Sequence, residues 1–266
     1  MAAVFPFLMG KKYIMHCHGT DLREFSYQKG FFPLLFRKLI RSADHVIATT
    51  YDLKKDYNTL GFDKRKFSCI PNSVLSNIPI KKTGSNYRAI RLFSPSSNHW
   101  TKEKNKLLKA YALLKKKYPF LTLDLLDDGR YQAEEIKGIV KTMGLDGIHF
   151  ITPASHEVLL KSYQKYDIVL DQFGENPIIG LITYEAMMCA IPAICTLGGN
   201  FRGELDDKSP ILPGYSPNAI YESVQYLIDN KKIEEHGQKS RDWAMGNVSE
   251  DAIASIYEAL YKQVIH

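Results

Sequence analysis

The segment from Gly180 to Cys195 contains the residues whose types and spacing most clearly suggest chemistry. An apolar run that ends at Leu170 precedes it, a loop with glycine follows, and a helix then begins that carries one acidic residue, Glu185. The free N–H groups and positive dipole at the start of such a helix suit a phosphate. A lone carboxylate in a buried helix is costly unless it meets a polar partner, such as a sugar hydroxyl. The segment therefore predicts a nucleoside-diphosphate site; the alternative is that Glu185 only complements the helix dipole.

Other polar residues and glycines directly follow predicted strands. Ligands of parallel sheets bind at the carboxyl ends of the strands, which meet at one edge. The topology is therefore expected to bring these residues to such an edge: His18, Asn98, Gly129, Gln172 and Gly180.

The hydrophobic pattern switches repeatedly between strand-like and helix-like periods. Strands are predicted over 13–16, 45–50, 67–70, 90–94, 121–126, 148–151, 168–170 and 193–196. Helices are predicted over 31–41, 51–60, 102–117, 132–143, 156–166, around Glu185, and over 218–230, 232–245 and 249–264. Strands that alternate with helices of this length predict an α/β fold with a doubly wound parallel sheet. Residues 75–88 lose the periodicity and form the best linker candidate.

Four motifs in this order resemble those of family-4-type glycosyltransferases, which have the GT-B fold. The first three are His18-Gly-Thr-Asp21, Ile70-Pro-Asn-Ser73, and Pro95-Ser-Ser-Asn-His99 with Lys102. The fourth is Gly180 followed by Glu185-Ala-Met, a small residue and Pro192. The resemblance covers the chain from about Tyr13 to the end and implies two Rossmann-like lobes around a sugar-nucleotide site.

The resemblance also implies roles for individual residues. His18 would lie over the donor sugar and act in catalysis together with Glu185, which would bind the ribose. Lys102 and the helix start near 178–181 would bind the diphosphate. The implied donor-binding set is Asn98, Lys102, Gly129, Gln172, Gly180, Leu181, Thr183 and Glu185.

Plainer interpretations stay open for two of these residues. His18 is also explained as a turn histidine bonded to Asp21, and Asp21 with Arg23 would make a local ion pair that shapes the loop. Lys102, together with Lys104 and Lys106, is also explained as part of a solvated basic face.

The chain departs from the family pattern in ways that bear on the donor. The family often has two glutamates; the second matches Glu185, and the first falls on Pro177, with Gln172 and Glu175 as nearby substitutes. The chain contains no D-x-D motif, so a mechanism without metal is expected. No metal and no cofactor are predicted. A zinc site at His16-Cys17-His18 is disfavoured, because a strand would turn Cys17 to the opposite face from both histidines.

The expected domain organisation follows from the resemblance. Residues 1–78 form a partial N-terminal Rossmann-like lobe with only about three strands, 79–88 a linker, and 89–248 a complete donor-binding lobe. Residues 249–266 form a helix that packs back on the N-terminal lobe. A fragment, or a partner that supplies the missing strands, would explain the incomplete lobe.

The composition limits the partners and the location. The net charge of +6 and the pI near 8.9 favour anionic partners, but no nucleic-acid-binding motif accompanies the scattered lysines. No segment has the length of a membrane span or the pattern of a signal peptide, and the four cysteines suit reduced core thiols, so a cytoplasmic protein is expected. Residues 31–41 combine apolar bulk with cations and suit either a core helix or a peripheral contact with the inner membrane face.

The function expected from these observations is sugar transfer from a nucleoside-diphosphate sugar to a glycan or lipid-linked acceptor, as in polysaccharide biosynthesis. By resemblance the transfer retains the anomeric configuration. The alternative is a non-catalytic GT-B-like subunit that binds a nucleotide or a partner.

Overall fold

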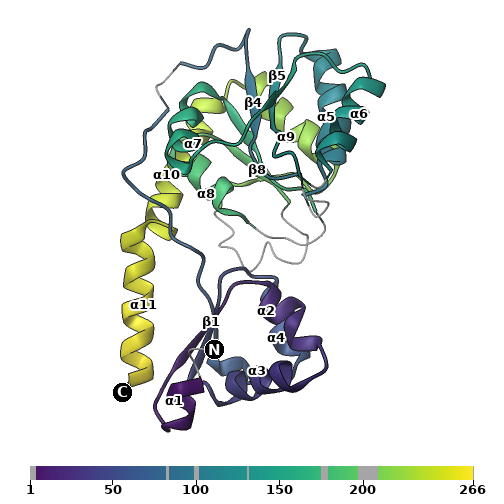
Figure 1. Cartoon of the computed structure of the whole chain (residues 1–266). Coiled ribbons are helices and arrows are strands. Elements are labelled where there is room, and N and C mark those ends of the chain that lie inside the picture. Colours follow the sequence, from purple (N-terminus) through teal and green to yellow (C-terminus); the bar gives the residue numbers. More distant parts are fainter. Residues whose placement is uncertain are drawn as a thin grey trace. The chain divides into compact units, whose positions relative to one another are not determined.

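The computed structural model describes residues 4–81, 84–98, 102–130, 132–174, 179–196 and 209–265. It contains two α/β units, each with a parallel sheet (Figure 1). Unit 1 comprises residues 1–73 and 250–266, and unit 2 comprises residues 74–249. The α/β class and the parallel sheets predicted from the sequence are confirmed.

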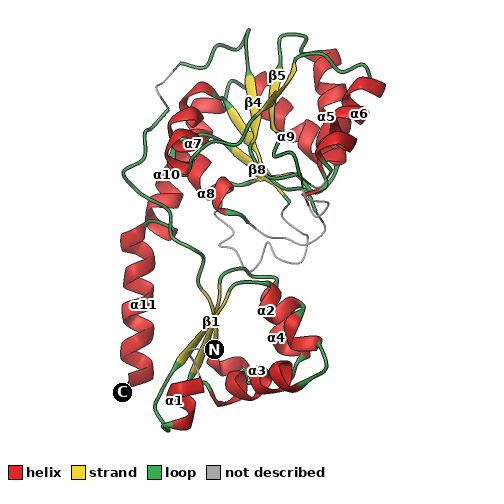
Figure 2. Ribbon diagram, viewed as in Figure 1, coloured by secondary structure: helices red, strands yellow, loops and turns green. Residues whose placement is uncertain are grey.

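Unit 2 is built on a six-stranded parallel sheet in the order β6-β5-β4-β7-β8-β9. Figure 2 shows its strands between helices on both sides. The central strands are buried on both faces, as is typical of parallel sheets covered by helices. The strands are β4 (Arg91–Ser94), β5 (Thr122–Leu126), β6 (Ile148–Ile151), β7 (Ile168–Leu170), β8 (Ala193–Cys195) and β9 (Leu212–Pro213).

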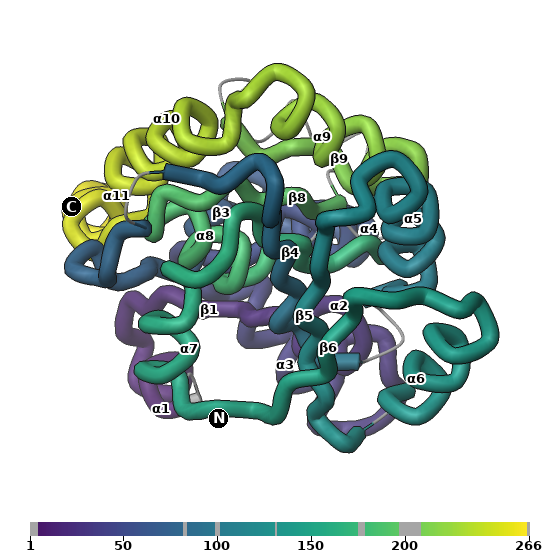
Figure 3. Tube along the Cα trace, turned by 90° about the horizontal axis from the view of Figure 1, so that it is seen from above, coloured from purple at the N-terminus to yellow at the C-terminus, as the bar shows by residue number. Residues whose placement is uncertain are grey.

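Helices cover both faces of this sheet. Helices α5 and α9 lie side by side with α6 nearby, while α8 packs against α10 (Figure 3). Fully buried Leu107, Tyr111 and Leu114 of α5 face the main core. The helices are α5 (Lys104–Lys117), α6 (Ala133–Thr142), α7 (His156–Ser162), α8 (Leu181–Met188), α9 (Pro217–Asp229) and α10 (Ile233–Asn247).

Helix α5 begins two residues later than predicted. Glu103 has a left-handed backbone with φ of 46°, which is incompatible with a continuous helix. Lys102 therefore lies in the segment before the helix rather than in its first turn. The C-terminal end of the helix matches the prediction at Lys117.

Unit 1 has a three-stranded parallel sheet in the order β1-β2-β3. In β1, Met15 and Cys17 face the core made with α3 and α4, whereas Ile14 lies with the cluster made by α11. Figure 1 shows α11 on the opposite side of this sheet from α2, α3 and α4. The elements are β1 (Ile14–Cys17), β2 (His45–Ala48), β3 (Phe67–Cys69), α1 (Val4–Leu8), α2 (Thr20–Arg23), α3 (Phe31–Ser42), α4 (Leu53–Thr59) and α11 (Glu250–Ile265).

The segment after unit 1 is attached to unit 2. The Lys81 ammonium lies 2.5 Å from Asp167, and Tyr87 donates to Glu234 over 2.8 Å. Val74 bridges to Ser249, beside the boundary where the chain returns to unit 1. Residues 79–88, expected as a linker, therefore belong to unit 2 and make side-chain contacts within it where they are described.

Candidate functional site

The carboxyl edge of the unit 2 sheet gathers the predicted donor-binding residues. Asn98 follows β4, Gly129 follows β5, and Gln172 follows β7. Gly180 is the N-cap residue of α8, Leu181 is its first residue, and Thr183 and Glu185 lie further along it. All of these, like Lys102, belong to unit 2. His18 instead follows β1 of the separate sheet in unit 1, so the expectation that it shares one sheet edge with the other four residues is wrong.

Asp171 fixes the start of α8 against the end of β7. Its carboxylate is buried, and its Oδ2 accepts a hydrogen bond from Thr183 Oγ1 over 2.8 Å. Burial raises the pKa of Asp171, against the lowering effect of Lys102 and the Thr183 hydrogen bond. A Cβ atom at Gly180 would lie 3.0 Å from the same Oδ2, so glycine is the residue that fits this approach. The Thr183 N–H also donates to the Gly180 carbonyl over 3.1 Å, so the start of the helix is held in place.

The three lysines near α5 have different surroundings. The Lys102 ammonium donates to Gln172 Oε1, beside Asp171. Lys104 is 3% exposed and donates to Ser94 Oγ over 2.8 Å, and burial lowers its pKa to about 7. Lys106 donates to the carbonyl of Phe173. The interpretation of all three lysines as a solvated face is wrong for Lys104, because its ammonium is buried against Ser94 at the end of β4.

Asn98 joins the loops after β4 and β5. Its Nδ2 donates to the Leu126 carbonyl over 2.9 Å, and its buried Oδ1 has no hydrogen-bond partner among the described residues. Gly129 has φ of 62°, and its N–H donates to Asp127 over 3.2 Å. A turn of this kind leaves the backbone exposed for close approach by a ligand.

Glu185 is bound at both carboxylate oxygens. It is 6% exposed and is the fifth residue of α8, beyond the helix's first turn. Tyr163 donates to Oε2 over 3.1 Å, and Nε2 of His156 lies 2.7 Å from Oε1. Burial and the Glu185 charge raise the pKa of Tyr163 well above its usual value. The polar partner that this carboxylate needs is therefore present within the protein, in two residues that sequence reasoning missed.

A small apolar pocket of about 180 Å³ opens along the same strand ends. Tyr166 stacks on Phe93 with ring centroids 4.0 Å apart, and Leu126 and Pro153 line the pocket beside them. Its size and apolar lining suit a flat ring. Residues 152–154 form part of this pocket and directly follow β6. Their position after a predicted strand would have identified them as candidate site residues.

His18 lies at the carboxyl end of β1 in unit 1. Its backbone N–H and that of Gly19 donate to the Asp21 carboxylate, each over 2.9 Å. The hydrogen bond that links His18 to Asp21 is thus made by the backbone N–H of His18. Arg23 pairs instead with Asp52, donating from Nε over 2.9 Å, so the expected ion pair of Asp21 with Arg23 is wrong. The carboxylate of Asp21 is committed to the turn, and the guanidinium reaches α4's N-cap residue.

The exposed ring of His18 lies against that of His16, with centroids 4.4 Å apart. Tyr257 of α11 hydrogen-bonds His16 Nε2 over 3.2 Å. Burial and the neighbouring His18 ring lower the pKa of His16. As predicted, Cys17 is turned to the buried face, away from both histidines.

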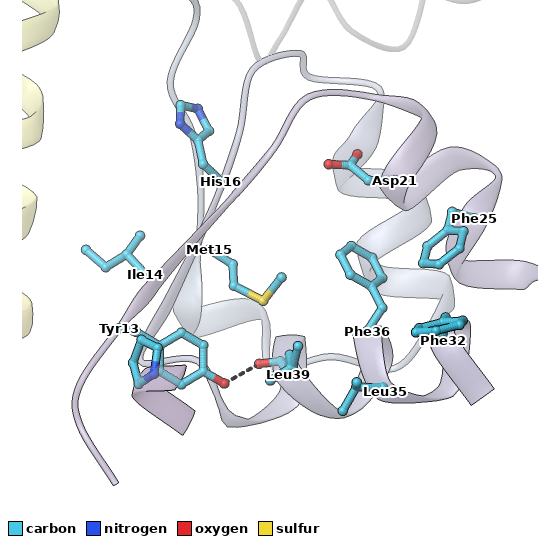
Figure 4. Close-up of a pocket in the computed structure, with 11 residues that line it drawn as sticks. Tyr13, Ile14, Met15, His16, Asp21, Phe25, Phe32, Leu35, Phe36 and Leu39 are labelled. Atoms are coloured by element: carbon cyan, nitrogen blue, oxygen red, sulfur yellow. Dashed lines mark hydrogen bonds between the residues drawn. The ribbon is translucent and has the colours of Figure 1, made fainter. Parts of the chain in front are cut away.

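A second cavity, of about 700 Å³, lies in unit 1 between β1 and α3 (Figure 4). Figure 4 shows Met15, Phe32 and Phe36 around it, and a hydrogen bond from Tyr13 to the Leu39 carbonyl at one end. Asp21 is the acidic residue in its lining. The sequence pattern did not predict this cavity.

Several expected features lie outside the described residues. These are Glu175, Pro177, Ile178 and His99. Within the described ranges, no three His, Cys, Asp or Glu residues are placed to hold a metal ion. No helix in those ranges has both the length and the apolar character needed to cross a bilayer.

Two protein-family models match the sequence. The model described as "Glycosyl transferases group 1" matches residues 80–243, and that described as "Glycosyltransferase Family 4" matches residues 1–75. No match was found among curated proteins.

Solved structures of glycosyltransferases are similar to all or part of the chain. HepE of Anabaena, solved with UDP-glucose, is 18% identical with a TM-score of 0.74, over 98% of this chain and 75% of that one. Sucrose-phosphate synthase of Thermosynechococcus elongatus is 16% identical with a TM-score of 0.70, over 99% and 71%. The C-terminal domain of a group 1 glycosyl transferase of Francisella tularensis is 20% identical with a TM-score of 0.54, over 66% and 99%. At these identities the likeness concerns the fold.

Proposed function

Because the chain belongs to the group 1 glycosyltransferases, we propose that it transfers a sugar from a nucleoside-diphosphate sugar to a glycan or lipid-linked acceptor. The observation that carries this proposal is the cluster at the carboxyl edge of unit 2. There Lys102, Asp171 and the start of α8 meet at the strand ends. A cation beside the start of a helix suits a diphosphate.

In this proposal each part of the edge binds one part of the donor. Lys102, Gln172, Gly180, Leu181 and Thr183 surround the diphosphate. Glu185 accepts hydrogen bonds from the ribose, and the apolar pocket near Phe93 takes the base. Asn98 and Gly129 lie beside the donor in the loops after β4 and β5.

The proposed chemistry needs no divalent ion. As the bond to the sugar breaks, negative charge grows on the leaving diphosphate. The Lys102 ammonium and the α8 dipole would stabilise that charge, because they are fixed before the reaction begins. His18 would contact the sugar from unit 1 and act in catalysis. Retention of the anomeric configuration is proposed from the family resemblance.

The acceptor and the setting are also proposals. Helix α3 exposes Phe31, Phe32 and Leu34 and carries Arg37 and Lys38, a combination that suits the inner face of an anionic membrane and a lipid-linked acceptor. A cytoplasmic role in polysaccharide biosynthesis agrees with that arrangement. We also propose that further strands, from a partner, add to the sheet at β1, which is an edge strand among the described residues.

A non-catalytic nucleotide-binding subunit is the second candidate. Two observations favour it: Glu185 is already satisfied by His156 and Tyr163, and Pro177 stands where the family often has its first glutamate. This candidate predicts nucleotide binding without turnover.

Release of UDP from UDP-glucose tests both candidates. HepE, whose fold the chain shares, was solved with this donor, so UDP-glucose is the first choice, with GDP-mannose second. Hydrolysis or transfer above the level of a Lys102→Met variant supports the enzyme. Tight binding of UDP or GDP with no release would favour the binding subunit, and failure to bind either would contradict both.

A further inference from the structure

Two side chains bind the Glu185 carboxylate, and they differ in how firmly they are held. Tyr163 is fully buried, and its ring packs edge-on against Phe93 with centroids 5.7 Å apart. The side chain of His156 is 61% exposed. Tyr163 is therefore fixed by the core, whereas His156 can rotate into solvent without opening a cavity.

His156 also controls access to the carboxylate. The Glu185 side chain is 7% exposed with the imidazole 2.7 Å from Oε1. The backbone at His156 is fixed, because the Ser155 side chain caps α7 by accepting a hydrogen bond from the Val158 N–H. Because so little of the carboxylate is exposed, we expect a hydroxyl that donates to Oε1 to take the place of the imidazole, by rotation of one side chain rather than by movement of the helix.

We propose that His156 competes with the donor's ribose for Glu185 and so limits how tightly the site holds a ribonucleotide. The inference rests on the proposed function, in which Glu185 binds the ribose. A ligand gains the full contact with Glu185 only if its hydroxyls replace the hydrogen bond that His156 gives up. The contact with Glu185 should therefore make the site favour ribonucleotides over 2′-deoxyribonucleotides, and His156, by competing for the same carboxylate, should reduce that preference.

Calorimetric titration of the full chain with UDP and 2′-deoxy-UDP tests this proposal. The wild type is compared with His156→Ala, which removes the competitor, and with His156→Gln, whose amide can still donate to Glu185. Because a pair with one exposed partner is weak, His156→Ala should bind UDP only about three- to fivefold more tightly. The gain should be smaller for 2′-deoxy-UDP, and His156→Gln should stay near the wild type.

Two controls separate competition from a general effect on the protein. His149 is an exposed histidine on the neighbouring strand β6, and His149→Ala should leave UDP affinity unchanged. In a Glu185→Gln background, His156→Ala should lose its effect, because the charged acceptor for which it competes is gone.

The outcomes distinguish this inference from the proposed function. If the wild type binds UDP and His156→Ala binds it equally or more weakly, the inference is wrong and the proposed function stands. A weaker variant would show that His156 orients Glu185 instead. If neither protein binds UDP or GDP, the proposed function fails and the inference fails with it.

Discussion

The two units hold their polar site residues in different ways. In unit 2, Asp171, Glu185 and Lys104 are buried, and each is bound by a side chain from another segment. In unit 1, the ring of His18 is exposed and rests against His16, and a cavity of about 700 Å³ lies beneath β1.

This difference indicates different contributions to function. Groups that are fixed before a ligand arrives bind it without an ordering cost, which agrees with the proposal that unit 2 holds the nucleotide. An exposed histidine with few fixed contacts is suited to act on a group that reaches it during the reaction. Substitutions in unit 2 should therefore change stability or affinity, and substitution of His18 should change turnover.

The largest effect is expected where unit 2 is packed most closely. A Cβ atom at Gly237 of α10 would lie 2.1 Å from the backbone oxygen of Ala190, between α8 and β8. Because backbone has to move, Gly237→Ala should lower the free energy of unfolding by about 3 kcal/mol. Denaturant unfolding measures this, with Gly246→Ala in the same helix as control, since nothing lies within 4 Å of that position. Equal stability of the two variants would contradict the close packing.

His18→Ala should separate turnover from binding. A contact made only in the transition state raises the rate without tightening ground-state binding. We expect kcat/KM for the donor to fall about 100-fold, as is typical for loss of a catalytic side chain, while UDP affinity stays within about threefold. Donor turnover beside UDP titration measures both quantities. Intact turnover in the variant would remove His18 from the mechanism.

Glu185→Gln should weaken nucleotide binding more than it changes stability. Charge-assisted hydrogen bonds to ribose hydroxyls are worth roughly 1.5–3 kcal/mol, or about tenfold or more in affinity. The glutamine amide can still accept from Tyr163, so the fold should persist. Titration with UDP and a melting curve test this together. Unchanged affinity at an unchanged melting temperature would assign Glu185 to structure.

The smallest effect is expected at the rim of the unit 1 cavity. Phe32 is 57% exposed although its ring lines the cavity. Truncation there removes little buried surface, so Phe32→Ala should change the free energy of unfolding by less than about 1 kcal/mol. Denaturant unfolding of the wild type and the variant measures this change in the free energy of unfolding. A loss comparable with that of Gly237→Ala would mean that unit 1 is as closely packed as unit 2.

The fold could be predicted from the sequence because parallel strands and the helices that cover them have distinct periods in their hydrophobic pattern. The strands ending at Ser94, Leu126 and Leu170 were predicted at these ends, which placed the loops that follow them. The two-residue strand β9 was missed, because so short a segment has no period to detect.

Side-chain partners were less predictable than the elements. Glu185 was expected to need a polar partner, yet His156 and Tyr163 lie 29 and 22 residues away along the chain. Arg23 pairs with Asp52, 29 residues away, rather than with nearby Asp21. Such pairs depend on how residues 156–163 meet α8 and on the packing of α2 against α4, which local patterns do not specify.

Titration of the full chain with UDP and GDP, with EDTA and then with added Mg²⁺, tests how the diphosphate is bound. In the proposed function, Lys102 and the start of α8 bind it at the carboxyl edge of unit 2 without a metal. We predict that at least one nucleotide binds with EDTA present, that Mg²⁺ changes its affinity less than about twofold, and that Lys102→Met weakens binding about tenfold or more. Binding that requires Mg²⁺, or that is indifferent to Lys102, would contradict the claim.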